Sequence, residues 1–251
     1  MTTVMQIRTA EGRDMDPTPA VEFRDVVKRY GAGPTDVMAL RGVSLSVGPG
    51  EFVAVMGPSG CGKSTLLHLA GALEPPSAGR VIVAGRDLDG MAPTEQAEIR
   101  RTHLGYVFQK LNLIPALTAL ENVMLPLELD AIPTKAARRA AHDALGAVGL
   151  AEQLDRYPDE FSGGQQQRIA IARAVVGDRR LLLADEPTGA LDTTNSDQVI
   201  ELLAGLRDDR GTAIVMVTHE PRFASWADRV VFMRDGVIVD ESLPASDRPT
   251  P

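Results

Sequence analysis

The chain has 251 residues, of which 44% are hydrophobic, and a formal net charge of −8 at pH 7. This length allows one large domain or two modest ones with a sizeable buried core. The negative charge argues against broad electrostatic attraction to nucleic acid or to anionic lipid, so we expect no nucleic-acid partner.

The cysteine content and the hydropathy pattern narrow the class of protein further. The single cysteine, Cys61, excludes an intrachain disulfide and a thiolate metal cluster. The sequence has no run of about 18 apolar residues of the kind that spans a membrane. It also lacks an N-terminal basic stretch followed by an apolar run, the mark of a secretory signal. We therefore expect a cytoplasmic location.

The first part of the chain predicts a leader followed by strands. Residues 1–19 are polar, contain Pro17 and Pro19, and predict a disordered leader. Short apolar or alternating runs between glycine and proline turns indicate strands, and a helix is predicted from Lys63 until Pro75 breaks it. The predicted strands are Val21–Tyr30, Leu40–Val47, Phe52–Met56, Arg80–Val83 and Leu104–Gln109, with a loop at residues 31–34.

The middle of the chain changes from strand-rich to helical. Thr118–Leu129 and Pro133–Val148 carry apolar residues at helical spacing and have little strand propensity. A further helix is predicted after Ser162 and extends to about Val176, where Gly177 stops it. This section therefore predicts a mostly helical lobe.

The last third alternates between strands and helices. Continuous apolar strands separated by helices are typical of a parallel sheet that is covered on both faces. From Pro244 the tail is rich in turn residues, and we expect residues 244–251 to be flexible. The predicted elements are strands at Leu181–Ala184 and Ala213–Val217, helices at Ser196–Leu206 and Arg222–Asp228, and a hairpin of Val230–Met233 with Val237–Val239.

A phosphate-binding motif lies between a predicted strand and a predicted helix. The sequence there matches G-x-x-x-x-G-K-[ST], and its glycines let backbone N–H groups converge on phosphate oxygens at the positive end of the helix. Lys63 can reach the β- and γ-phosphates, and the Ser64 hydroxyl can bind Mg²⁺. The predicted loop consists of Gly57, Pro58, Ser59, Gly60, Cys61, Gly62, Lys63, Ser64 and Thr65.

Two carboxylates follow the buried strand Leu181–Ala184. Ligands of open α/β sheets bind at this end of the strands. One carboxylate can hold Mg²⁺ while its neighbour polarises a water for in-line attack on the γ-phosphate. Because adjacent strand residues point to different sides, we assign Asp185 to the metal and Glu186 to the general base.

A second unusual helix start has the sequence Ser162-Gly163-Gly164-Gln165. Two glycines at this position cost stability, but they allow an anion to approach the backbone closely, with Ser162 as N-cap and donor. A self-complementary dimer explains a second phosphate-binding helix start, because each subunit would close over the nucleotide of the other. The alternative is a simple N-cap beside a flexible loop.

With these paired motifs the sequence resembles the ATP-binding subunits of ABC transporters, over about Val21–Asp240. In this family, a signature that ends in Ser-Gly-Gly-Gln contacts ATP across the dimer, and Phe161 here stands where leucine is usual. The resemblance implies an α/β P-loop NTPase with a RecA-like core, a mostly parallel sheet, an antiparallel β subdomain and an inserted helical subdomain. It implies one ATPase domain over residues 20–243, with the core at about 20–108 and 166–243 and the helical lobe at about 109–165.

The resemblance also implies roles for single residues. Tyr30 matches the aromatic residue that stacks on adenine, and Gln109 matches the glutamine that contacts Mg²⁺ and the attacking water. Asp192, in Ala190-Leu191-Asp192, matches a loop that passes between subunits, and His219 matches the histidine that contacts the γ-phosphate. Because no motif is missing, the resemblance implies an active, Mg²⁺-dependent ATPase that forms a homodimer around two ATP molecules.

The segment after Gln109 indicates a subgroup. Residues 108–115 and 117–127 resemble the group that includes macrolide-export and lipoprotein-release ATPases. This implies a peripheral position on the cytoplasmic face of the membrane, through a separate permease that works in export or extracytoplasmic mechanotransmission. The alternatives are an importer subunit, a regulatory ATPase that controls cell-wall hydrolases through a membrane partner, or a soluble ABC ATPase that acts on nucleic acid or ribosomes.

Overall fold

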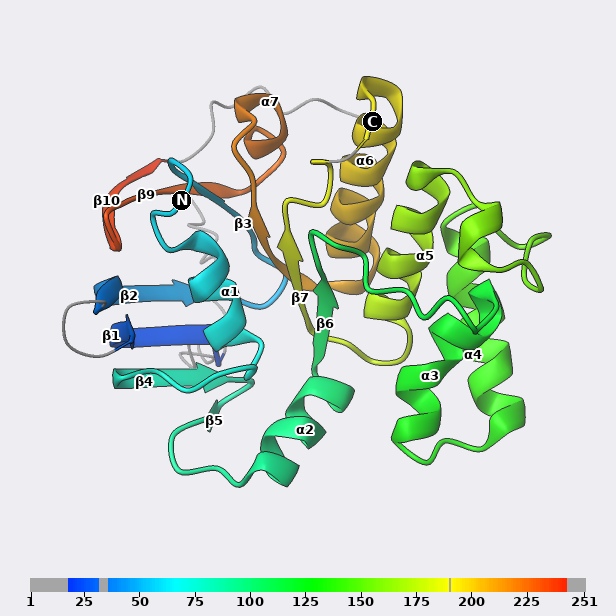
Figure 1. The fold of residues 1–251 in the computed structure, drawn as a ribbon, viewed down its shortest axis with the longest axis horizontal. Coiled ribbons are helices and arrows are strands. Elements are labelled where there is room, and N and C mark those ends of the chain that lie inside the picture. Colours follow the sequence, from blue (N-terminus) through cyan, green and yellow to red (C-terminus); the bar gives the residue numbers. More distant parts are fainter. Residues whose placement is uncertain (1–17, 32–35, 190, 243–251) are drawn as a thin grey trace, which may run out of the picture.

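The computed structural model describes residues 18–31, 36–189 and 191–242, and Figure 1 shows their arrangement. The predicted leader up to residue 17, loop residues 32–34, Ala190 of the predicted intersubunit loop and the predicted flexible tail lie outside the described residues.

The first of two sheets is antiparallel and has the order β2-β1-β4-β5. Its central strand alternates, because Val21 and Phe23 are buried while Arg24 is exposed. Val21 pairs with Val47 on one side and with Val83 on the other. The strands are β1 (Val21–Tyr30), β2 (Val37–Val47), β4 (Ala78–Val83) and β5 (Arg86–Asp87).

The second sheet has the order β10-β9-β3-β8-β7-β6, and its pairs are parallel except for β9 with β10. Every residue of β3, β7 and β8 is buried, which explains their uninterrupted apolar sequences. The strands are β3 (Phe52–Met56), β6 (Leu104–Val107), β7 (Leu181–Asp185), β8 (Ala213–Val217), β9 (Arg229–Arg234) and β10 (Val237–Ser242).

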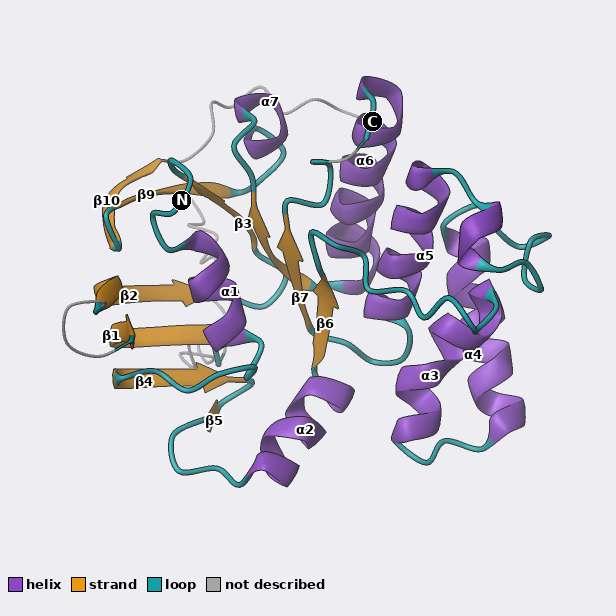
Figure 2. Ribbon diagram, viewed as in Figure 1, coloured by secondary structure: helices purple, strands orange, loops and turns teal. Residues whose placement is uncertain are grey.

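Helices cover both faces of this second sheet and form a separate group at one side of it (Figure 2). The buried side chains of β3 alternate, since Val53 and Val55 join the core beneath α1 while Phe52 and Ala54 join the core beneath α6. The helices are α1 (Lys63–Ala70), α2 (Pro93–Thr102), α3 (Ala119–Leu129), α4 (Thr134–Ala147), α5 (Gly163–Val175), α6 (Thr193–Arg210) and α7 (Pro221–Ala224), with a 3-10 turn at Pro158–Glu160.

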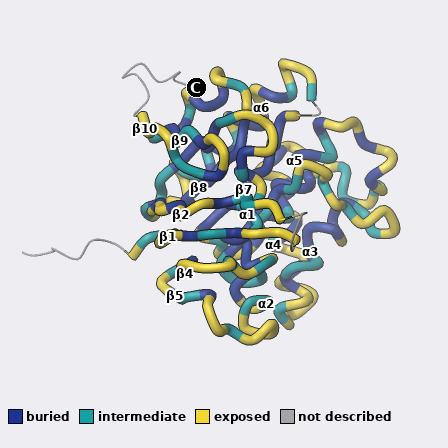
Figure 3. Tube along the Cα trace, turned by 60° about the vertical axis from the view of Figure 1, so that its left-hand side comes forward, coloured by how far each residue is buried: buried dark blue, intermediate teal, exposed yellow. Residues whose placement is uncertain are grey.

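A third core holds the helical group together. It lies between α3, α4 and α5, with Leu120, Leu145 and Ile169 fully or almost fully buried in it. Asn122 is also fully buried, and its amide donates to the carbonyls of Ile114, Leu117 and Thr118, which fixes the loop before α3. Figure 3 shows buried segments along the strands and inner helix faces, and exposed segments in the outer loops.

Several element boundaries differ from the predictions. The predicted strand Leu104–Gln109 ends at Val107, because the last paired residue of β7 on that side is Ala184. The predicted helix Arg222–Asp228 is only Pro221–Ala224. Helix α6 begins earlier than predicted, at Thr193, because the Asp192 side chain accepts a hydrogen bond from the Asn195 amide and caps the helix.

Candidate nucleotide site

The phosphate-binding motif forms the turn between β3 and α1, and its backbone admits only glycine at two positions. Gly57 has φ 151°, and a Cβ there would lie 2.1 Å from the Met233 carbonyl oxygen. Gly62 has φ 106°, and a Cβ there would lie 2.5 Å from the Ala39 carbonyl oxygen. The tight turn therefore brings the first amides of α1 to the carboxyl edge of the sheet.

This turn forms one wall of a cavity of about 290 Å³. The other wall contains two residues that the sequence predicted for catalysis and that lie far away along the chain. The cavity is lined by Ala39, Ser59, Gly60, Gly62, Lys63, Ser64, Thr65, Gln109 and Glu186. The structure thus brings the predicted phosphate loop, glutamine and general base together.

Lys63 is buried within this loop. Its ammonium donates to the carbonyl oxygens of Gly57 at 2.8 Å and Pro58 at 2.9 Å. These two bonds satisfy a buried charge with neutral acceptors, which are weaker partners than phosphate oxygens. The ammonium is therefore held beside the cavity and can exchange carbonyls for a triphosphate.

Asp185, the last residue of β7, lies against the other end of the loop. Its carboxylate accepts a hydrogen bond from the Ser64 hydroxyl at 3.2 Å. Burial raises the pKa of Asp185, and the bond from Ser64 opposes this rise. A cation at this position would favour the ionised form of Asp185. The Ser64 hydroxyl and the Asp185 carboxylate are therefore suited to bind a metal ion together.

Glu186 leaves the strand at φ 47°, in the left-handed region that is uncommon for glutamate. Its amide donates to the carbonyl of Val217, the last residue of β8. Each of its carboxylate oxygens has a partner: the Gln109 amide donates to one at 3.1 Å, and Nδ1 of His219 lies 3.4 Å from the other. The ends of β6, β7 and β8 therefore converge on one carboxylate.

The predicted signature forms the start of α5, away from this cavity. Ser162 and Gln165 make a reciprocal capping box, with bonds of 3.0 Å and 3.3 Å, and Ser162 and Gly163 are exposed. Figure 1 shows α5 separated from α1 by β6 and β7. The signature of one chain and the phosphate loop of the same chain thus do not share a site.

The two signature glycines serve different purposes. A Cβ on Gly164 would lie 2.6 Å from Oδ1 of Asn195, so this glycine is required for packing against α6. Gly163 has only Leu191 near it, at 3.9 Å, and its backbone is open to a ligand. Both glycines were predicted to admit an anion to the backbone, and this stays a prediction; packing against α6 gives Gly164 a further reason to lack a Cβ.

Asn195 was missed by the sequence analysis. Its side chain donates to Asp192 at 2.7 Å and contacts the position of Gly164, so it joins the predicted intersubunit loop to the signature. Its backbone N–H donates to Asp192 at 2.9 Å, and this bond is the main cause that lowers the pKa of Asp192. The spacing Asp-x-x-Asn, an N-cap pattern, was the available signal.

Tyr30 stands at the end of β1, beside α1. Its hydroxyl donates to Glu74, and the ammonium of Lys28 lies 4.9 Å from the centroid of its ring. Burial and the bond to Glu74 raise the pKa of Tyr30. Neither Lys28 nor Glu74 was predicted from the sequence as part of this site.

The fold and the cavity define a P-loop nucleotide-binding protein with two carboxylates at the carboxyl edge of its sheet. The sequence pattern of the ABC transporter family matches residues 40–189. The chain belongs to this family and is an ABC ATPase cassette.

Relatives of known sequence extend this result. The chain is 44% identical over 231 residues to a macrolide export ATP-binding/permease protein MacB of Syntrophobacter fumaroxidans, covering 91% of this chain but only 32% of that relative. It is 46% identical to the lipoprotein-releasing system ATP-binding protein LolD of Geobacter metallireducens, covering 87% of this chain and 97% of the relative. The chain therefore spans about a third of the length of the MacB relative and nearly the whole length of the LolD relative.

Solved structures agree with this assignment. A dimeric post-hydrolysis state of the cassette MJ0796, bound to ADP and Pi, is 39% identical, with a TM-score of 0.84 over 90% of this chain and 100% of that chain. A second dimeric structure of MJ0796 matches equally well. Among the described residues, no helix of this chain combines the length and the apolar character needed to cross a membrane.

Proposed function

We propose that this chain binds and hydrolyses ATP as one half of a homodimer and thereby drives a separate membrane permease of the macrolide-export or lipoprotein-release type. The observation that carries the proposal is the division of the site. One chain holds the phosphate loop, Gln109 and Glu186 in one cavity, with His219 beside Glu186, while its signature faces outward on another part of the surface.

Glu186 is the proposed general base. It accepts a proton from the water that attacks the γ-phosphorus in line, and the bond from that phosphorus to the leaving ADP oxygen breaks. Gln109 and His219 hold the two oxygens of this carboxylate and so fix its direction toward the cavity. Lys63 gives up its loop carbonyls to bind the β- and γ-phosphates of ATP, where its charge offsets the charge of the transferred group.

The residues around Ser64 fit Mg²⁺. This ion prefers oxygen ligands and usually takes one or two carboxylates together with substrate phosphates and water. The Ser64 hydroxyl, Asp185 and the amide oxygen of Gln109 are the protein oxygens proposed for it. Within the described ranges no three His, Cys, Asp or Glu residues gather into a metal site, so the remaining ligands would come from the nucleotide and water. The bound ion would neutralise phosphate charge.

The homodimer completes the site in this proposal. Ser162, Gly163, Gly164 and Gln165 of one subunit would contact the ATP held by the loop of the other. Asp192 lies beside this signature through Asn195, as expected for a loop at the dimer interface. Both solved structures of the relative MJ0796 are dimeric, which supports this arrangement.

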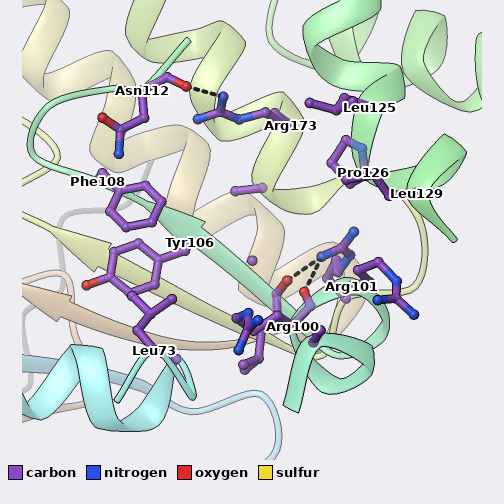
Figure 4. Close-up of a pocket in the computed structure, with 16 residues that line it drawn as sticks. Leu73, Arg100, Arg101, Tyr106, Phe108, Asn112, Leu125, Pro126, Leu129 and Arg173 are labelled. Atoms are coloured by element: carbon purple, nitrogen blue, oxygen red, sulfur yellow. Dashed lines mark hydrogen bonds between the residues drawn. The ribbon is translucent and has the colours of Figure 1, made fainter. Parts of the chain in front are cut away.

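The permease would dock in a groove of about 510 Å³ at the boundary of the proposed helical lobe, residues 109–165 (Figure 4). Apolar side chains of α3 form one side of the groove, and Phe108 lies across from them. Leu129 is 64% exposed and Leu73 is 44% exposed, and both line this one groove, so these exposed apolar side chains are gathered there. Docking of this kind would place the chain on the cytoplasmic face of the membrane.

The test is an affinity purification of Glu186→Gln from native membranes with ATP, followed by mass spectrometry. We expect a permease with few spans and a large external domain, and we expect its recovery to fall when Leu129→Glu is added. Val239→Glu, at a residue of β10 that is 54% exposed and does not line the groove, serves as the comparison, with folding checked by melting temperature. Recovery of ribosomal proteins, or equal recovery with Leu129→Glu, would contradict the proposal. A cell-wall hydrolase in the eluate would favour the regulatory alternative.

A further inference from the structure

One carboxylate behind the proposed base-stacking residue is used by no step of the mechanism above. Glu74 follows α1, and its side chain is 22% exposed. Three side chains surround it. Lys28 lies 2.8 Å from one oxygen, while the Tyr30 hydroxyl and Nδ1 of His68, at 3.4 Å, share the other.

We propose that Glu74 is a positioning residue for nucleotide binding, which fixes the ring of Tyr30 for the base of ATP. The inference rests on the proposed nucleotide site and deepens it, since it names the groups that determine affinity for the base. Without partners for its hydroxyl, Tyr30 would be a strand-end side chain with two free torsions; the hydroxyl bonds Glu74 and also Thr65, which lines the cavity. The hydrogen bond from its hydroxyl to Glu74 holds the Tyr30 ring in one orientation before the base binds.

Lys28 offsets the cost of partly burying the Glu74 carboxylate. The lysine is only 8% exposed, and its ammonium also donates to the Pro75 carbonyl at 2.8 Å. It thus neutralises Glu74 in a fixed position rather than as a mobile surface ion pair. The same ammonium lies 4.9 Å from the centroid of the Tyr30 ring, within range of a cation–π contact.

The ring retains surface for a base. Tyr30 is 38% exposed, although its hydroxyl is bonded to Glu74 and the Lys28 ammonium lies over its ring. Stacking of a base on an aromatic side chain needs only an accessible face and tolerates different bases. Tyr30 would therefore recognise the planar base of a nucleoside triphosphate, while the phosphate-binding loop would bind the phosphates.

A purely structural role would be that Glu74 ties β1 to α1. The two roles differ in what they predict for a ligand without a base. We would measure the affinities of ATP and inorganic tripolyphosphate by calorimetry without added Mg²⁺, so that ATP is not hydrolysed. The variants are Tyr30→Phe, which removes only the hydroxyl, Glu74→Gln, and the double variant.

We expect each single variant to bind ATP about 2- to 12-fold more weakly, the range of one ordered aromatic contact. The double variant should lose no more than Tyr30→Phe alone, because Glu74→Gln weakens to a neutral bond the contact that Tyr30→Phe already removes. Tripolyphosphate affinity should not change. Glu22→Gln is the matched control, since Glu22 is 24% exposed, is paired with Arg24 and lies on the same strand.

Two results would overturn the inference. The first is unchanged ATP affinity in both single variants, and the second is an equal loss for ATP and tripolyphosphate. Tyr30→Phe keeps the ion pair of Glu74 with Lys28, so it provides the test even where Glu74→Gln folds poorly. Failure of the unmodified chain to bind either ligand would instead contradict the proposed nucleotide site.

Discussion

Replacing Glu186 by glutamine separates binding from hydrolysis. The change keeps the size of the side chain and one oxygen, but it removes the carboxylate that would accept the proton of water. The amide also places an N–H₂ group toward either Gln109 or His219, where the structure has two acceptor oxygens. Loss of a positioned general base typically costs about 10²- to 10⁴-fold in rate, so kcat should fall by that factor.

Phosphate release gives kcat, calorimetry gives ATP affinity, and light scattering after gel filtration gives the mass with and without ATP. We expect ATP affinity to be retained and a dimer to accumulate, because the state before hydrolysis persists. Glu201→Gln, an exposed position on α6, is the matched control and should behave as the unmodified chain. A kcat for Glu186→Gln within about 3-fold of the unmodified chain would refute the base assignment, because that corresponds to less than 1 kcal/mol of barrier.

The other predictions concern the loop, the signature and the metal ligand. Lys63→Ala should lose most nucleotide affinity in calorimetry, because the only ammonium lining the described cavity disappears. Ser162→Arg should bind ATP as a monomer but show no ATP-dependent dimer by light scattering; loss of monomer binding would contradict a signature that acts across the interface. Gly164→Ala should lower the melting temperature, because its Cβ would meet Asn195 at 2.6 Å, and Asn195→Ala should restore part of the loss. Asp185→Asn should raise the nucleotide-free melting temperature at pH 7, and acidification should narrow the difference. The reason is that folding raises the pKa of Asp185, so the folded state favours the protonated acid. The contribution of Asp185 to folding stability is therefore complete at low pH and is lost as the pH rises through the folded pKa. Each 1 kcal/mol corresponds to about 2–4 °C in a domain of this size.

Buried parallel strands were the most predictable part of the fold. The boundaries of β3 and β8 match the predicted Phe52–Met56 and Ala213–Val217, because each sequence is apolar throughout and is flanked by polar residues or glycine. Helix α2 was not predicted, since Ile99 is its only buried residue and the apolar periodicity that indicates a helix is missing. A proline at its first position and Glu95 as a capping residue were its only local signals.

The same distinction applies to the site. Residues within one motif, such as Lys63 and Ser64, can be assigned from spacing because the turn that carries them is local. Glu74 and Tyr30 are 44 positions apart, and only the folded arrangement of β1 beside α1 brings them together. Local motifs therefore predict the groups proposed to contact the phosphates, but they do not predict the residues that hold those groups in place.

The residues after β6 connect the proposed docking groove to the nucleotide cavity. Tyr106 and Phe108 stack with ring centroids 4.1 Å apart, and both line the groove. The next residue, Gln109, lines the nucleotide cavity and donates to Glu186. Consecutive Cα atoms are about 3.8 Å apart across a rigid peptide plane, so a segment that displaces Phe108 moves Gln109 with it. Because the strand ends at Val107, Phe108 and Gln109 are free of the sheet ladder, and this short unpaired segment is where the proposed docking would change the orientation of Glu186, the proposed general base.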